Sequence, residues 1–182
     1  MEFSLKKEDL PHYTYEDYSK WEGKWELIQG IPYAMNSPRI NHQKVSFKIA
    51  KQLDQLLQGS KSCESIMAID WKIVEDTVVQ PDNIVICGEN KDEAKVIIPP
   101  VLVFEILSPS TTRTDKILKY QIYQEAGVKY YCIVDPVSKG VDVFNMIGER
   151  FKMMEIAEPG YFTFDLGPCV IAFNCIEIFD HL

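Results

Sequence analysis

The chain has 182 residues, which at about 150 residues per domain predicts a single domain over residues 1–182. It carries 19 Lys and Arg against 27 Asp and Glu, and this net charge of -8 argues against a protein that coats DNA or anionic membrane through bulk charge. No apolar run approaches the roughly 20 residues of a membrane helix, and the N-terminus has no secretory signal. We therefore expect a cytoplasmic protein without membrane contact, with its five widely spaced cysteines reduced and buried.

The N-terminal part predicts a short helix followed by a hairpin. A capping box at residues 14–17 begins a helix that ends near Trp21. Residues 25–28 and 31–35 are apolar segments on either side of Gln29-Gly30, a dipeptide typical of a tight turn. These two segments are therefore expected to pair as antiparallel strands.

The longest helix is predicted after this hairpin. Ser37 is a suitable N-cap, Pro38 suits the first helical position, and Gly59 is a typical C-terminal residue. The apolar residues recur at steps of four, four and three and form one stripe, Val45, Ile49, Leu53 and Leu56. One face of this helix is thus expected to pack against a sheet.

The middle of the chain is rich in predicted strands. Residues 67–73 alternate between apolar and polar, as on a half-buried strand. Residues 78–87 predict a second strand, interrupted by Pro81, which favours an edge or a bulge. Residues 101–107 are apolar on both faces and predict a strand in the centre of the sheet.

A strand–helix–strand unit follows. A helix from about Asp115 to Ala126 ends at Gly127, and the apolar segment 130–134 predicts the next strand. Such a unit is a parallel crossover and indicates an α/β core. After Pro136, short strands alternate with Gly and Pro turns, which suggests a β meander at the edge of the sheet.

The charge is unevenly distributed along the chain. Residues 39–61 carry five Lys and Arg and one Asp, and residues 113–130 carry four basic against two acidic residues. Residues 62–112 carry three basic against nine acidic residues. Acidic strands between basic helices would suit a metal site that faces a polyanion, although by composition alone a solvated helix face is the commoner explanation of the lysines.

Glu105 is the most informative single residue. It is the only charged residue from Val101 to Leu107, and an unpaired carboxylate in a buried strand would cost several kcal/mol. It therefore needs a metal ion, a Lys or an Arg as its partner. The alternatives are a purely structural ion pair or a strand end that is more exposed than the pattern indicates.

Asp82 is the second candidate ligand. It follows Pro81 within an apolar segment, and two strands with a connecting loop fit the interval to Glu105, so that the carboxylates could lie side by side. Two such carboxylates, with waters and substrate phosphate, are the ligands that Mg²⁺ prefers, and Mn²⁺ is a possible substitute. A Pro-Asp pair is also an ordinary turn signal.

A nuclease site of this kind needs a lysine near the two acids. The acidic-x-Lys tripeptide typical of such sites occurs four times in the chain, about as often as chance allows, but the second position after Glu105 is Leu107, so the tripeptide is absent from this site. The following helix can supply the cation from Lys116 or Lys119, which lie three residues apart and are expected to share a face. Glu26 in the first hairpin is a further possible ligand, or an exposed strand carboxylate.

Substrate contacts are expected from the long basic helix and from the second helix. These candidate substrate-binding residues are His42, Lys44, Lys48 and Lys116. The sequence has none of the nucleotide-binding, serine-hydrolase or zinc-protease motifs. His42 could touch a phosphate, although a surface histidine is the commoner case.

Several of these segments together resemble a known family. The segments are Trp25-Glu26-Leu27-Ile28-Gln29-Gly30, Gln80-Pro81-Asp82, Phe104-Glu105-Ile106-Leu107-Ser108-Pro109-Ser110-Thr111, Asp115, Lys119, Tyr123, Ala126-Gly127-Val128 and Tyr131-Cys132-Ile133-Val134-Asp135-Pro136. In this order, over a core of about residues 13–150, the chain resembles the Uma-type restriction endonuclease family.

The resemblance implies the PD-(D/E)XK nuclease fold, with a mixed sheet flanked by helices, and a homodimer. It also implies a metal-dependent phosphodiesterase site in which Asp82 and Glu105 bind Mg²⁺, Lys119 replaces the missing tripeptide lysine, and Glu26 is the acidic residue near the N-terminus. We therefore expect a Mg²⁺-dependent DNA endonuclease that engages DNA weakly. The alternative is a catalytically inactive binding or assembly module with a structural Glu105–Lys119 ion pair.

Overall fold

The computed structural model describes residues 11–108, 114–157 and 160–182, with the side chains of 114 and 115 excepted. Its largest element is a six-stranded mixed sheet in the order β10-β9-β8-β7-β6-β3. The strands of this sheet are β3 (Cys63–Met67), β6 (Asn83–Cys87), β7 (Leu102–Ile106), β8 (Tyr130–Asp135), β9 (Gly140–Ile147) and β10 (Arg150–Met154). β7 and β8 are parallel and all other neighbours are antiparallel, so the predicted crossover and mixed sheet are confirmed.

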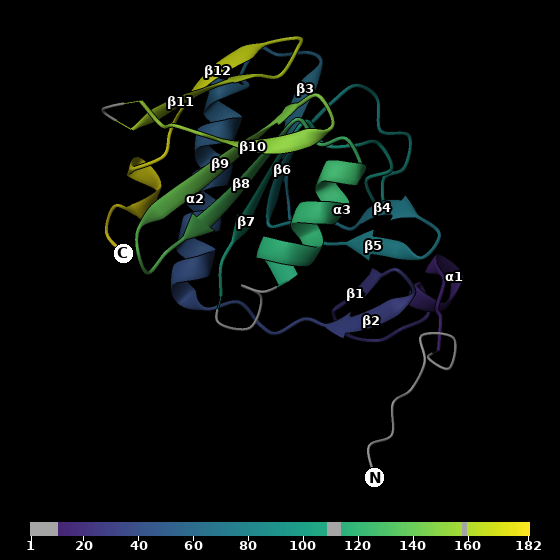
Figure 1. Cartoon of the computed structure of the whole chain (residues 1–182). Helices are drawn as coiled ribbons and strands as arrows, with labels where there is room; N and C mark the ends of the chain where they lie inside the picture. The colour runs from purple at the N-terminus through teal and green to yellow at the C-terminus, as the bar shows by residue number, and fades with distance from the viewer. Residues whose placement is uncertain (1–10, 109–113, 158–159) are drawn as a thin grey trace.

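Helices cover both faces of this sheet (Figure 1). One face packs against α2 (Ile40–Leu56), where Val45, Ile49 and Leu53 of the predicted stripe are buried and Leu56, its fourth member, is partly buried. The opposite face packs against a π-helical turn at Thr114–Lys119 that continues into α3 (Tyr120–Glu125). Because both faces are covered, the central strand β7 is buried along its whole length, as its sequence predicts.

A second sheet lies beside α3, in the order β2-β1-β5-β4. Its strands are β1 (Trp25–Ile28), β2 (Ile31–Ala34), β4 (Trp71–Val74) and β5 (Thr77–Val79), and the short helix α1 (Tyr15–Tyr18) precedes β1. The predicted hairpin is confirmed: Gln29 and Gly30 have φ of 50° and 75°, the left-handed values of a type I′ turn. The segment 80–82 joins the two sheets, because β5 belongs to one and β6 to the other.

Beyond β10, the strands β11 (Tyr161–Asp165) and β12 (Val170–Asn174) form a separate hairpin, and a 3₁₀ turn at Glu177–Phe179 follows. The hairpin packs with α2 in the same hydrophobic core, around Phe164 and Phe173. The predicted meander at the sheet edge therefore holds for β9 and β10, which follow β8 as successive antiparallel neighbours. No helix in the described part of the chain is long and apolar enough to cross a membrane.

Two local predictions were wrong. The long helix begins at Ile40 rather than near Ser37, with Arg39 as its N-cap. Residues 67–73 are not one strand, because the chain turns at Ala68, whose φ is 42°, and separates β3 from β4. The alternating pattern continues through this turn, so it cannot reveal the break.

The prediction that all five cysteines are reduced was also wrong. Cys63 lies directly opposite Cys87 in the antiparallel pair of β3 and β6, and their sulfurs form a disulfide. A separation of 24 residues gives no sign of this pairing, which depends on strand register. The free thiols are Cys132, Cys169 and Cys175.

Candidate active site

A lysine and two glutamates meet between the two sheets. Lys119 Nζ lies 2.8 Å from Oε1 of Glu26 on β1 and 2.9 Å from Oε1 of Glu105 on β7. The residues are 4%, 5% and 3% exposed, respectively, and we call them the acid–lysine trio. Three elements distant in sequence thus bring charged groups together where charge would otherwise be costly.

Lys119 reaches Glu105 because of the parallel crossover. The chain leaves β7, passes through the π-helical turn and returns over the same face of the sheet that carries the Glu105 side chain. The Lys116 side chain does not point toward Glu105 as Lys119 does, because Lys116 is exposed whereas Lys119 is buried. The prediction that the two lysines share a face was wrong, because a π-helical turn is wider than the α-helix on which three-residue spacing depends.

Tyr123 is a fourth member of the site. Its hydroxyl donates to Glu105 Oε1 at 2.6 Å, and its ring stacks on Trp71 with centroids 5.6 Å apart. Burial, reinforced by the negative charge of Glu105, raises the pKa of Tyr123 well above its ordinary value. The hydroxyl therefore stays protonated and gives the carboxylate a second donor beside Lys119.

Asp82 lies at the end of β6, next to the trio. Asn83 pairs with Phe104, so the register places Asp82 opposite Glu105, just beyond the last paired residue. Its Oδ2 accepts the backbone N–H of Ile106 at 2.8 Å and lies 3.2 Å from Nε2 of His42 on α2. The side chain of Asp82 is 21% exposed, so this carboxylate is the solvent-accessible edge of the site.

Residues 80–82, which join the two sheets, contact one acidic residue of the site, Glu26, and contain another, Asp82. The backbone N–H of Gln80 donates to Glu26 Oε1 at 2.8 Å, and Asp82 follows two residues later. The Gln80 side chain donates to Asp70 Oδ1 at 3.1 Å, and the Tyr18 hydroxyl donates to Asp70 Oδ2 at 2.9 Å. A continuous set of hydrogen bonds thus links α1 to the trio.

Sequence reasoning missed the Asp70–Gln80–Tyr18 hydrogen bonds and the contact of Tyr123 with Glu105. The available signal was the spacing of Lys119 and Tyr123, four residues apart and therefore on one face of a helix. Asp70 begins the acidic-x-Lys tripeptide Asp70-Trp71-Lys72, but such tripeptides are expected by chance in this composition and do not single it out.

The lysines predicted on α2 lie elsewhere. The Lys44 ammonium donates to the His181 carbonyl at 3.5 Å, and that of Lys48 donates to the Asp180 carbonyl. Both contacts are with the C-terminal segment. Of the predicted substrate-binding residues, His42 contacts a predicted metal ligand, Asp82.

A family sequence model described as "Putative restriction endonuclease", Uma2, matches residues 15–163. The match spans most of the chain and includes the four charged residues of the site. The chain belongs to the Uma2 family. The resemblance noted from the sequence motifs is therefore confirmed.

Two similar proteins add to this assignment. The "Uncharacterized protein slr1290" of Synechocystis is 30% identical over 145 residues, which cover 75% of each chain. The crystal structure of a "putative nuclease belonging to DUF820" from Anabaena variabilis superimposes with a TM-score of 0.73 at 15% identity, over 91% of this chain and 97% of that one. The latter likeness supports the fold of this Uma2 chain, a nuclease-like α/β architecture.

The side chains of the site suit partial coordination of a metal rather than an all-protein cage. In the part of the chain that the structure describes, no three His, Cys, Asp or Glu side chains gather as a metal-binding group. Mg²⁺ is commonly held by one or two carboxylates, with waters and substrate phosphates as the other ligands. Asp82 and Glu105, on adjacent strands, match that smaller requirement.

Proposed function

We propose that this Uma2 chain is a metal-dependent DNA endonuclease whose site is formed by Asp82, Glu105, Lys119 and Glu26. The observation that carries the proposal is the acid–lysine trio beside Asp82. Metal-assisted phosphodiester hydrolysis requires two acids and one cation. Glu105 and, at the adjacent strand end, Asp82 supply the acids, and the buried Lys119, which Glu26 also contacts, supplies the cation.

Each residue has a distinct role in this proposal. Asp82 and Glu105 would hold Mg²⁺ or Mn²⁺, and the bound ion would supply Lewis-acid polarisation of the scissile phosphate. Lys119 provides the positive charge that is missing at position 107, where Leu107 stands in place of the tripeptide lysine. Glu26 holds the Lys119 ammonium in place through a 2.8 Å contact. The N–H groups of Gln80 and Ile106 fix the carboxylates of Glu26 and Asp82.

Charge favours an additional cation at this point. Glu26 and Glu105 bring two carboxylates to one ammonium group, and Asp82 adds a third carboxylate at the adjacent strand end, within a chain of net charge -8. A divalent ion beside Asp82 would offset this acidity, and DNA phosphates could then approach an otherwise repulsive surface. DNA binding that depends on metal, rather than on bulk positive charge, follows from this balance.

The test is plasmid nicking by the purified protein with Mg²⁺ or Mn²⁺, with and without EDTA. Glu105→Gln and Asp82→Asn should each abolish nicking, because each removes one proposed metal ligand. Glu64→Gln is the matched control, since Glu64 is an exposed carboxylate on β3, away from the site. Nicking that survives Glu105→Gln would refute the site assignment.

A second candidate is a nuclease-fold binding module without catalysis. The specific observation in its favour is that Glu105 Oε1 already accepts two donors, Lys119 and Tyr123, as a structural ion pair would. Titration calorimetry with Mn²⁺ separates the two candidates: heat of binding that Asp82→Asn removes supports the nuclease. Absence of binding, with Glu105→Gln as stable as the parent, supports the module.

The homodimer implied by the family resemblance stays a prediction, and light scattering of the purified chain tests it.

A further inference from the structure

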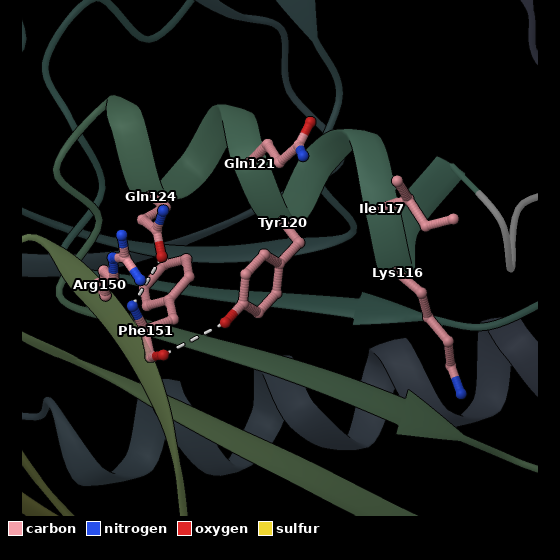
Figure 2. A pocket seen from close by; sticks show the side chains of 7 residues that line it. All are labelled: Lys116, Ile117, Tyr120, Gln121, Gln124, Arg150 and Phe151. Carbon is pink, nitrogen blue, oxygen red and sulfur yellow. Dashed lines mark hydrogen bonds between the residues drawn. The ribbon is translucent and has the colours of Figure 1, made fainter.

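A groove runs along the outer side of α3, where the helix meets the last strands of the large sheet. Its volume is about 540 Å³, within the range of small-molecule and substrate pockets of roughly 300–1,000 Å³. We call it the α3 groove, and it is lined by Lys116, Ile117, Tyr120, Gln121, Gln124, Arg150 and Phe151. Figure 2 shows Tyr120 and Gln124 of the helix beside Arg150 and Phe151 of β10, with Lys116 toward the other end of the helix.

The floor of the α3 groove is fixed by two hydrogen bonds to one residue of β10. The Tyr120 hydroxyl donates to the Phe151 carbonyl at 3.2 Å, and Gln124 Oε1 accepts the Phe151 N–H at 2.8 Å (Figure 2). The Tyr120 ring also meets the rings of Phe144 and Phe151 edge to face, with centroids 5.2 and 5.3 Å away. The groove is therefore a formed surface, not one that a ligand must create.

Two cations stand at opposite ends of this floor. In Figure 2, the Lys116 and Arg150 side chains lie on either side of Tyr120. Both residues are exposed, and among the described residues neither has a carboxylate within salt-bridge distance. Acidic side chains also lie near Lys116: Asp142 lines a smaller adjoining hollow with it, and the charge of Lys116 acts on Asp135. Lys116 and Arg150 place positive charge at both ends of the groove, and this arrangement suits an anionic ligand.

The spacing of the groove suits a strand rather than a single anion. Lys116 and Gln124 are eight residues apart, so the helical side of the groove extends about 12 Å. Lys116 also lies only three residues before Lys119 of the proposed catalytic site. A ligand in the groove would therefore lie along the exposed side of the helix whose buried side carries Lys119.

We propose that the α3 groove holds the phosphate backbone of a nucleic-acid strand, with Lys116 and Arg150 as its two phosphate contacts. The proposal rests on the proposed function, because it extends the same substrate beyond the cleavage site. The amide of Gln121 at the rim adds a neutral donor, and the Tyr120 ring gives the sugar an apolar surface. Contacts of this kind position a strand without reading its sequence.

The test is fluorescence anisotropy of a labelled 20-base-pair DNA duplex, with Ca²⁺ in place of Mg²⁺ and with the salt concentration varied. Lys116→Ala and Arg150→Ala should each weaken binding about 3- to 10-fold at low salt. Each should also reduce the slope of log K against log salt by about 0.7–0.9, the value of one lost phosphate contact. Lys24→Ala is the matched control, because Lys24 is an exposed lysine outside the groove and should bind DNA like the parent.

The outcomes separate this proposal from the nuclease proposal. If the parent nicks DNA while both groove variants bind like the parent, the groove assignment is overturned and the nuclease stands. If the groove variants lose binding but no protein nicks DNA, the groove stands and the nuclease fails. The groove assignment is also overturned if the parent binds no DNA. It is overturned as well if an acidic polypeptide of equal charge displaces the labelled DNA from the parent as well as unlabelled DNA does.

Discussion

The hydrogen bond from Tyr123 to Glu105 can be removed by changing one atom. Tyr123→Phe deletes the hydroxyl and keeps the ring, so the stacking on Trp71 is retained. The lost bond has a charged acceptor, and such bonds contribute about 1.5–3 kcal/mol. We expect the free energy of unfolding at pH 7 to fall by about that amount, measured by urea denaturation with the fluorescence of the adjacent Trp71.

The same variant has a distinctive pH dependence. The pKa of Tyr123 is raised in the fold, whereas an unfolded tyrosine titrates near pH 10. The stability that Tyr123 contributes is therefore complete below about pH 10 and is lost as the pH rises further, by up to about 1.4 kcal/mol per unit. The stability difference between the parent and Tyr123→Phe should be constant from pH 7 to 9 and should shrink above pH 10.

Tyr120→Phe is the control for this prediction. The Tyr120 hydroxyl donates to a neutral backbone carbonyl, so its removal should cost only about 0.5–1.5 kcal/mol. If Tyr123→Phe costs no more than Tyr120→Phe, the hydroxyl does not hold Glu105 and the reasoning fails. A parent–variant difference that is unchanged between pH 9 and 11 would refute the shifted pKa.

Two further predictions concern buried groups. Lys119→Met leaves buried carboxylates without their cation and should destabilise the fold by about 3–5 kcal/mol in thermal or urea unfolding. Adding Glu26→Gln should recover part of this loss, and a double variant no more stable than the single one would contradict the coupling. Burial raises the pKa of Cys132 well above its usual range and that of Cys175 to about 12, so at pH 8 iodoacetamide should label the half-buried Cys169 first. Because both buried thiols remain protonated in the fold, stability should also decline as the pH rises above the unfolded thiol pKa of about 8.5; prompt native-state labelling of Cys132 would contradict this burial.

The main layers of the fold could be predicted because their residues have a single consistent pattern. β7 is apolar on both faces and is central, and the stripe on α2 faces the sheet. The break between β3 and β4 could not be predicted, because the apolar alternation passes through Ala68 unchanged. The Cys63–Cys87 disulfide likewise depends on the register of two strands, which is set by tertiary packing.

The candidate site was predictable as a set of residues but not as a geometry. Glu105 was identified because a charge in an apolar strand needs a partner, and the structure gives it Lys119. Tyr123 was not identified, because an aromatic residue on a helix face is usually only part of the core. Its hydroxyl contact depends on the depth at which α3 packs over β7, which local sequence does not specify.

The position of residues 80–82 explains why the site lies between two sheets. Pro81 cannot donate a ladder hydrogen bond, so pairing ends between β5 and β6 and the chain passes from one sheet to the other. The N–H of Gln80 is thereby available to Glu26, and Asp82 is placed at the strand end where it accepts the N–H of Ile106. The break in strand pairing at Pro81 therefore helps to position two carboxylates of the site, those of Glu26 and Asp82. A substitution of Pro81 that allowed the ladder to continue would be expected to disturb both acids at once, whereas Asp82→Asn would change only one.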